Sequence, residues 1–290
     1  MNRVADFVQL MRPHQWIKNV FVFTGFIFIH AWDDFALLQR VVMSAAGFCL
    51  MSSGIYILND IVDREQDRRH PRKKNRPLAA GRVSVSAAGA LGVFLTMASL
   101  GLAFRVSQAT FLMLLAYGLM NVLYSFHLKH RVLLDVFVIA AGFMLRILVG
   151  TLGVGIPPSQ WLVLCGIMIT LFLGFSKRRA EIITMGEGES NHRSVLKHYS
   201  PVFLDQMIGI TATGAIMSYS LYTMSPDTIR IHGTENLIYT VPIVIYGVFR
   251  YIYLLHHRHG GTDTAHDIVR DPWLVLTLVA WFGATLWLIT

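Results

Sequence analysis

The sequence predicts an all-α protein that crosses a membrane about nine times. Apolar residues make up 54% of the 290 residues and charged residues only 14%, against roughly a quarter charged residues in soluble domains. The apolar residues gather in stretches close to the length that a helix needs to cross a bilayer. No stretch alternates in the manner of a strand, and a helix satisfies its own backbone hydrogen bonds inside lipid. A helical membrane protein is therefore expected.

Nine apolar segments are separated by polar loops. The first is the shortest, and we expect it to tilt or to dip into the membrane. No segment reads as a separate soluble domain, so residues 1–290 are expected to form a single membrane-embedded domain. The predicted spans are 19–32, 38–58, 86–105, 109–126, 133–151, 160–176, 203–222, 237–255 and 272–289.

The loop charges predict the orientation of the chain. Lys and Arg concentrate in alternate loops, as expected of loops that face the cytoplasm. The net charge of +8 therefore needs no nucleic-acid partner. We expect an inner (plasma) membrane protein whose N-terminus and active-site cavity face the cytoplasm. The predicted cytoplasmic pieces are 1–18, 59–85, 127–132, 177–202 and 256–271.

The strongest chemical signal is an acidic motif between Asn59 and Asp67. Its aspartates, Asp60, Asp63 and Asp67, are spaced three and four residues apart, which puts them on one face of a helix. Asn59 lies four residues before Asp63 and joins that face. Like charges so close repel one another, and Mg²⁺ is usually bound by one or two carboxylates together with substrate phosphates. The motif predicts a Mg²⁺ site, and the alternative is a solvated helix end at the membrane surface.

Basic residues follow the acidic motif directly, in the segment Arg68–Arg76, which includes Lys73 and Arg76. A metal bound by carboxylates, next to a basic loop, can hold a polyanionic substrate. The alternatives are ordinary cytoplasmic loop charge and a contact with anionic lipid. Lys18, just before the first span, either reaches a phosphate or extends to the membrane surface.

A second polar patch lies around the start of the fifth span. Tyr124 and Lys129 precede it, and Asp135 and Arg146 lie within it. An ionisable residue inside a membrane helix is costly and by default marks a polar cavity. Asp135 and Arg146 are eleven residues apart, about three helical turns, so they share a face. The alternative is an ion pair between one of them and another helix.

A third patch, Ser176-Lys177-Arg178-Arg179-Ala180-Glu181, ends the sixth span. Lys177 and Arg178 lie four and three residues before Glu181, which are the spacings at which helical side chains pair. We predict that these cations bind phosphate groups. Ordinary cytoplasmic charge is the alternative here too.

At these residues the chain resembles the UbiA superfamily of intramembrane prenyltransferases. The family's first motif, NDxxDxxxD, is complete in Asn59, Asp60, Asp63 and Asp67, and it follows the second span as it does in the family. The nine-helix plan fits as well, so the resemblance covers essentially the whole chain. It implies a UbiA-like helical bundle with the active-site cavity on the cytoplasmic side.

One departure from the family pattern points to a branch of it. Where typical members carry a second DxxxD motif, this chain has Lys177 to Glu181. That sequence resembles the GKR-x-x-E pattern of the decaprenyl-phosphate phosphoribosyltransferase branch, with Ser176 in the place of the usual Gly. Other segments similar to that branch are Arg12-Pro13-His14-Gln15-Trp16-Ile17-Lys18-Asn19, Tyr124-Ser125-Phe126-His127-Leu128-Lys129-His130, Arg193-Ser194-Val195-Leu196 with Tyr199, and Phe203-Leu204-Asp205.

The resemblance implies a Mg²⁺-dependent transfer of 5-phosphoribosyl from phosphoribosyl pyrophosphate to a polyprenyl phosphate. The donor carries a 5-phosphate besides its pyrophosphate, which suits an extra basic patch. The acceptor's tail would lie in a groove between helices that opens to the bilayer. A homo-oligomer is compatible with the pattern. The alternatives are a prenyltransferase that acts on an aromatic acceptor, a transporter or channel, and a non-catalytic lipid-binding scaffold.

The roles implied for single residues follow from this reaction. Asp63 and Asp67 with Asn59 would hold Mg²⁺, and Asp60 would support them. Asp135 would stabilise the positive charge that develops on the ribose, or bind a ribose hydroxyl. Glu181 would orient the neighbouring cations or touch the ribose. The residues expected to bind the rest of the substrate are Lys18, Lys73, Arg76, Tyr124, Lys129, Arg146, Lys177 and Arg178.

Overall fold

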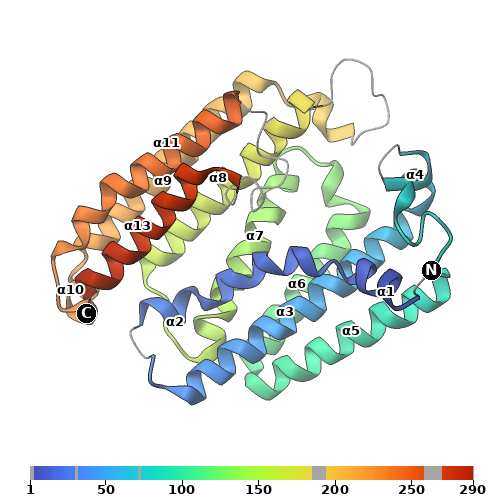
Figure 1. Ribbon diagram of the computed structural model, residues 1–290, viewed down its shortest axis with the longest axis horizontal. Coiled ribbons are helices and arrows are strands. Elements are labelled where there is room, and N and C mark those ends of the chain that lie inside the picture. The colour runs from blue at the N-terminus through green and yellow to red at the C-terminus, as the bar shows by residue number, and fades with distance from the viewer. Residues whose placement is uncertain (1–2, 30–31, 71–72, 185–193, 258–269, 290) are drawn as a thin grey trace. The chain divides into compact units, whose positions relative to one another are not determined.

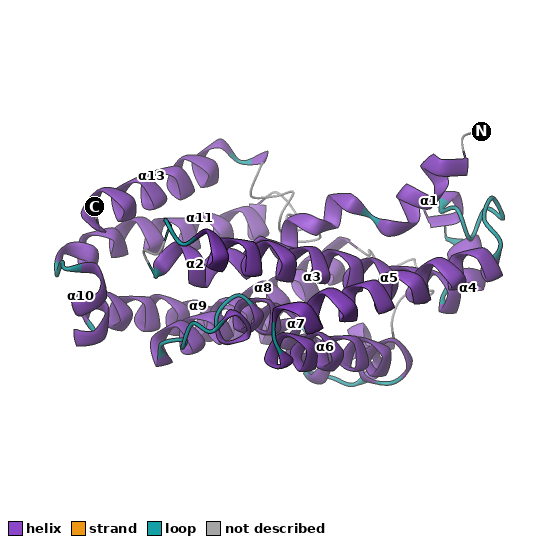
Figure 2. Cartoon of the chain, turned by 90° about the horizontal axis from the view of Figure 1, so that it is seen from below, coloured by secondary structure: helices purple, strands orange, loops and turns teal. Residues whose placement is uncertain are grey.

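The computed structural model describes residues 3–29, 32–70, 73–184, 194–257 and 270–289. Within these ranges every regular element is an α-helix or a 3₁₀-helix (Figure 2). This confirms the predicted all-α class. In the same ranges, seven helical segments are long and apolar enough to cross a membrane: Phe35–Val62, Val85–Val106, Gln108–Phe126, Leu134–Val154, Gln160–Ile183, Asn236–His257 and Pro272–Ile289.

The internal contacts divide the chain into two compact units. Unit 1 consists of Met1–Leu128 and Leu145–Pro157, and unit 2 of Lys129–Met144 and Pro158–Thr290. The chain passes from unit 2 back to unit 1 within helix α7, Leu134–Val149. The expectation of one domain over residues 1–290 stays a prediction.

Unit 1 is built around the long helix α3, which packs along α5 (Figure 1). Side-chain caps fix where its helices begin. The carboxylate of Asp34 accepts a hydrogen bond from the Leu37 amide at 2.8 Å, and Ser107 accepts one from the Thr110 amide at 2.9 Å. The elements are α1 Arg3–Met11, η1 Pro13–Phe23, α2 Thr24–Phe28, α3 Phe35–Val62, α4 Arg64–Arg69, η2 Lys73–Asn75, α5 Val85–Val106, α6 Gln108–Phe126 and η4 Leu152–Val154.

The first predicted span, 19–32, is not one continuous α-helix. It begins inside the 3₁₀-helix η1 and continues as the five-residue α2. Gly150, just after α7, lies so close to the backbone of Val22 that a Cβ on Gly150 would overlap the Val22 carbonyl. A 3₁₀-helix is narrower than an α-helix, which suits this close backbone approach. The segment is not among the seven candidate spans of the described residues.

Unit 2 places α8 along α9 (Figure 1), and Phe172, Phe175, Leu204 and Leu255 lie in its hydrophobic core. Helix α8 continues past the predicted span end at 176, so Lys177 to Glu181 are helical. The predicted span 203–222 corresponds to α9, which is not among the seven candidate spans. The elements, of which the first two are shared with unit 1, are η3 Leu128–His130, α7, α8 Gln160–Thr184, η5 Ser194–His198, α9 Pro201–Met224, α10 Pro226–His232, η6 Asn236–Thr240, α11 Val241–His257 and α13 Pro272–Ile289.

Candidate active site

The acidic motif lies where α3 ends and α4 begins. Asp63 separates the two helices, yet its amide donates to the Asn59 carbonyl at 2.9 Å and its carbonyl accepts from the Asp67 amide at 2.8 Å. Helical hydrogen bonding therefore continues across the junction. The spacing predicted to gather the aspartates on one side is retained, and Asp60 and Asp67 meet the same cation.

That cation is Arg76. Its Nη1 lies 3.1 Å from Oδ1 of Asp60 and 2.6 Å from Oδ2 of Asp67. Lys73 extends toward the same place, with Nζ 3.9 Å from Oδ1 of Asp67. The two carboxylate side chains are only 4% exposed, and buried charges require such partners. The structure thus brings together Asp60, Asp67, Lys73 and Arg76, all of which were expected at the site.

Arg12 joins this group and was not among the predicted site residues. Its guanidinium pairs with Asp60 and lies 5.0 Å over the centre of the Tyr56 ring. Burial lowers the pKa of Arg12, and the neighbouring Asp60 acts in the opposite direction. Its backbone is left-handed, with φ of 52°, a strained conformation for a non-glycine residue that persists only where the surrounding contacts fix it. The position of an Arg directly before Pro13 is the sequence signal that could have indicated it.

Asn59 points to helix α6. Its carboxamide oxygen accepts a hydrogen bond from the hydroxyl of Ser125, a buried residue near the end of α6. Tyr124 is the preceding residue and is half-buried. Ser125 therefore fixes the orientation of the Asn59 amide, a role that was not predicted for it.

The donor set fits Mg²⁺, because Asn59, Asp63 and Asp67 offer the amide and carboxylate oxygens that this ion prefers. Among the described residues, however, no group of three or more His, Cys, Asp or Glu side chains is arranged to hold a metal. In this structure Arg76 and Lys73 lie against Asp67. The Mg²⁺ site stays a prediction. A bound ion would either share the Asp67 carboxylate with these two cations or displace them from it.

Arg146 is buried in unit 1, away from the acidic motif in sequence. Its Nε donates to the Asn19 side-chain oxygen at 2.8 Å, and its Nη2 donates to the Tyr117 hydroxyl at 3.0 Å. The guanidinium also lies over the rings of Phe48 and Tyr117. Arg146 therefore holds η1 in place through Asn19. Lys18 is the residue before Asn19, so the same contact fixes the backbone that carries Lys18. Substrate binding by Arg146 and Lys18 stays a prediction.

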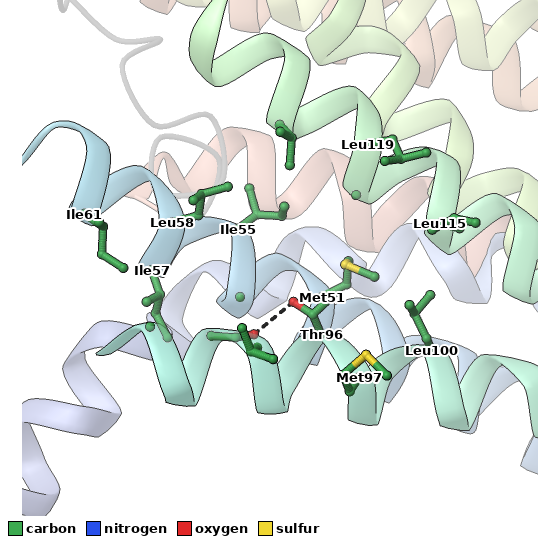
Figure 3. A pocket seen from close by; sticks show the side chains of 16 residues that line it. Met51, Ile55, Ile57, Leu58, Ile61, Thr96, Met97, Leu100, Leu115 and Leu119 are labelled. Atoms are coloured by element: carbon green, nitrogen blue, oxygen red, sulfur yellow. Dashed lines mark hydrogen bonds between the residues drawn. The ribbon is translucent and has the colours of Figure 1, made fainter. Parts of the chain in front are cut away.

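An apolar groove of about 360 Å³ lies between α3, α5 and α6 of unit 1 (Figure 3). Leu58, Ile61, Met97 and Leu119 are among its walls. Its one hydroxyl, on Thr96, donates to the Gly92 carbonyl at 2.9 Å. The groove thus presents apolar surface and suits an apolar chain. The polar residues of the acidic motif, Asn59, Asp60, Asp63 and Asp67, do not line it, and the expected place of a lipid tail stays a prediction.

Unit 2 contains a second charged group, centred on Arg178. Its side chain is fully buried, with Nε 2.6 Å from Oδ2 of Asp135, and it also pairs with Glu181. The pairing of Arg178 with Glu181 on α8 is confirmed. For Asp135 the structure shows the alternative interpretation, an ion pair with another helix, because its partner Arg178 lies on α8. The catalytic role of Asp135 and the phosphate contact of Arg178 stay predictions, and in this structure each holds the other.

Tyr199 completes this group and was not predicted as a site residue. Its hydroxyl donates to Oδ1 of Asp135 at 2.7 Å and accepts from the amide of Leu133 at 2.7 Å. Burial, followed by the hydrogen bond to Asp135, raises the pKa of Tyr199, so the phenol stays a donor. Leu133 has a positive φ of 66°, which is unusual for leucine. Tyr199 therefore holds a strained loop in place.

The remaining predicted cations lie on two elements of unit 2. Lys129 is half-buried in η3, and Lys177 is half-buried on α8 beside Arg178. Arg179, by contrast, pairs with Asp205 and donates to the Leu255 carbonyl at 3.1 Å, which joins α8 to α9 and α11. Arg193, part of the segments similar to the phosphoribosyltransferase branch, lies outside the described residues.

Comparison with known proteins identifies the family. The sequence profile of the UbiA prenyltransferase family matches residues 19–267. This chain belongs to the UbiA prenyltransferase family. The resemblance inferred from the acidic motif is thereby confirmed, and the chain is a multi-pass membrane protein.

Two relatives share most of the length of this UbiA family member. A protein of Corynebacterium glutamicum named decaprenyl-phosphate phosphoribosyltransferase is 34% identical over 290 residues, which cover 97% of this chain and 85% of the relative. A protein of Mycobacterium tuberculosis with the same name is 30% identical over 287 residues, covering 97% and 93%. A UbiA homologue from Archaeoglobus fulgidus, bound to DMAPP and Mg²⁺, has the same fold: the TM-score is 0.74 at 17% identity, over 98% of this chain and 99% of that one.

Proposed function

We propose that this UbiA family member transfers 5-phosphoribosyl from phosphoribosyl pyrophosphate to a polyprenyl phosphate of the decaprenyl class and releases pyrophosphate. The observation that carries the proposal is the pair of charged groups. One combines carboxylates with Arg12, Lys73 and Arg76. The other places Lys177 and Arg178 where a second acidic motif is typical of the family. Two relatives named decaprenyl-phosphate phosphoribosyltransferase support it.

The reaction forms a bond between an oxygen of the lipid phosphate and C1 of the ribose, and breaks the bond from C1 to the pyrophosphate. The attacking phosphate is already anionic at neutral pH, so no strong general base is required. Mg²⁺ bound at the acidic motif would lower the charge of the leaving pyrophosphate. The chain's contribution is then mainly positioning and charge stabilisation.

In unit 1 we assign the pyrophosphate to the acidic motif and its basic neighbours. Asp63, Asp67 and Asn59 would hold the metal, and Asp60 would keep Arg12 in place. Lys73 and Arg76 would bind phosphate oxygens. One feature of the structure supports this: Arg76 lies within ion-pair distance of Asp60 and Asp67, and Lys73 within ion-pair distance of Asp67. Lys18, Tyr124 and Arg146 would support the substrate from η1, α6 and α7.

In unit 2 we assign Lys129 and Lys177 to phosphate groups of the substrates. Arg178 and Asp135 are fully buried and paired, so we propose that they act by positioning Glu181 and Lys177. Glu181 is the more accessible member, at 20% side-chain exposure, and would touch the ribose or the neighbouring cations. Because the basic loops lie at predicted cytoplasmic positions, the reaction would take place at the cytoplasmic face of the plasma membrane.

The test is a transfer assay with the purified protein in detergent. Labelled phosphoribosyl pyrophosphate, decaprenyl phosphate and Mg²⁺ are incubated with wild type, with Asp63→Asn and with the matched control Asp227→Asn. Asp227 is 71% exposed and pairs only on the surface with Arg230. The expected result is a Mg²⁺-dependent labelled lipid from wild type and from the control. Asp63→Asn should lose at least 100-fold in rate, on the order of what one charge-stabilising group contributes.

A different outcome would redirect the assignment. If no labelled lipid forms, while a prenyl diphosphate and an aromatic acceptor do react, the donor proposed here is wrong. The alternative of an aromatic prenyltransferase would then hold.

A further inference from the structure

Arg76 connects the basic loop to the acidic motif through direct ion pairs. A single guanidinium joins Asp60 and Asp67, at 3.1 and 2.6 Å. Those two carboxylates come from different helices, α3 and α4. Arg76 thus lies against oxygen atoms that a metal ion would also need.

The side chain of Arg76 reaches these carboxylates from a turn near the surface. It follows η2, with its amide 2.9 Å from the Lys73 carbonyl, and is 30% exposed, against 4% for the two carboxylates. Arg12, in contrast, is fixed by a left-handed backbone and by the Tyr56 ring, as well as by Asp60. Of the two arginines, Arg76 is therefore the one that can leave the carboxylates without a change in the helices.

The Arg76 guanidinium and a bound Mg²⁺ would compete for the same carboxylate oxygens. A guanidinium on Asp67 raises the cost of bringing a divalent ion to that residue, because like charges repel strongly at such distances. Its departure is costly as well, unless an anion receives the guanidinium. A diphosphate is such an anion, since arginine binds phosphate oxygens through paired hydrogen bonds.

We propose that Arg76 is an exchangeable internal cation that couples the binding of Mg²⁺ to that of the diphosphate. In the free protein it neutralises Asp60 and Asp67. When the metal and the diphosphate bind together, the metal takes the carboxylates and Arg76 moves to the phosphate. Each ligand alone binds weakly and both together bind tightly, which is a positive coupling free energy. This rests on the proposed use of a diphosphate and Mg²⁺, and it applies equally to a prenyl diphosphate.

The test compares Arg76→Gln with wild type by titration calorimetry on the full-length protein in detergent. The probes are Mg²⁺ alone, and inorganic pyrophosphate at saturating Mg²⁺. We expect opposite effects: Arg76→Gln binds Mg²⁺ alone at least fivefold more tightly and Mg²⁺–pyrophosphate at least tenfold more weakly. Arg82→Gln is the matched control, because it removes the same charge from the same loop but pairs with Asp6 at 2.7 Å. It should change neither affinity by more than twofold.

If Arg76→Gln binds Mg²⁺ alone no more tightly than wild type, the proposed exchange is overturned. The proposed function is tested separately, by the transfer activity of the wild-type protein, and would be unaffected by that result. Should Arg76→Gln not fold, Arg76→Lys keeps the charge but replaces the rigid guanidinium, whose Nη1 meets both carboxylates, by an ammonium group on a flexible stem. It should still bind Mg²⁺ alone at least twofold more tightly, and an unchanged affinity overturns the inference. A wild-type protein that binds no Mg²⁺–pyrophosphate contradicts both this inference and the proposed function.

Discussion

Arg146 illustrates how one buried side chain organises unit 1. It joins residues from three segments far apart in the sequence, Asn19 on η1, Tyr117 on α6 and its own helix α7. A charged residue inside a membrane protein is costly, and the hydrogen bonds and ring contacts offset that cost. The arginine thereby supports the segment that carries Lys18.

Replacing Arg146 by lysine should destabilise the protein. A lysine carries a single point charge and cannot donate to Asn19 and Tyr117 through a rigid fork as arginine does. The expected loss is about 2 kcal/mol, the range of a hydrogen bond to a charged group. The thermal unfolding midpoint in detergent measures it, with the exposed Arg230→Lys as control. Equal midpoints for Arg146→Lys and wild type would show that the bonds to Asn19 and Tyr117 contribute nothing.

Tyr199→Phe tests the second charged group. The substitution removes the donor to Asp135 and the acceptor for the Leu133 amide, and leaves the ring in place. We expect a loss of about 1–3 kcal/mol, as for a buried partner left unsatisfied, and a higher KM for the phosphoribosyl donor with a smaller effect on kcat. The control is Tyr239→Phe, which is 72% exposed. If the KM of Tyr199→Phe equals that of wild type, Tyr199 does not help to position the substrate.

At the level of the helices, the sequence predicted the position of most spans, but not the helix type of the first span or where α8 ends. The last predicted span, 272–289, coincides with α13, and 109–126 nearly coincides with α6. Apolar length is a local property, so it can be read from the sequence. The 3₁₀ form of η1 and the extension of α8 to Thr184 depend on packing against other segments, which no local pattern contains.

The same distinction applies to the candidate site. The spacing of three and four residues predicted that Asp60 and Asp67 share a side, because helical periodicity is local. The contacts of Arg12 with Asp60, of Ser125 with Asn59 and of Tyr199 with Asp135 join residues 48, 66 and 64 positions apart. Such pairs follow from the tertiary fold, so the roles of Arg12, Ser125 and Tyr199 could not be deduced from spacing.

Gly150→Ala tests the close approach of η1 to the segment after α7. A Cβ at this position would overlap the Val22 carbonyl, and backbone cannot move aside as a flexible side chain can. We expect destabilisation by about 1–3 kcal/mol, the usual cost of overpacking. Gly101→Ala on α5 is the control, because its Cβ meets open space and alanine favours the helix by about 1 kcal/mol. If Gly150→Ala unfolds no earlier than Gly101→Ala, the close approach does not constrain η1.

For the whole molecule, the loop charges predict that the acidic motif faces the cytoplasm. The test places single cysteines at two exposed positions, Glu65→Cys and Asp227→Cys, with Cys49 and Cys165 replaced. Glu65 is in the predicted cytoplasmic piece 59–85, and Asp227 follows α9 on the predicted outer side. A membrane-impermeant thiol reagent should label position 227 in intact cells and position 65 only after lysis. The reverse pattern would invert the topology and place the acidic motif outside.

The central claim concerns the donor, and one competition experiment tests it most directly. The purified protein receives equal concentrations of phosphoribosyl pyrophosphate and decaprenyl diphosphate, with decaprenyl phosphate and 4-hydroxybenzoate as acceptors and Mg²⁺ present. Mass spectrometry identifies the products. The account predicts a phosphoribosylated decaprenyl phosphate as the dominant product. A dominant prenylated benzoate would contradict it and would show that this chain uses a prenyl diphosphate as its donor.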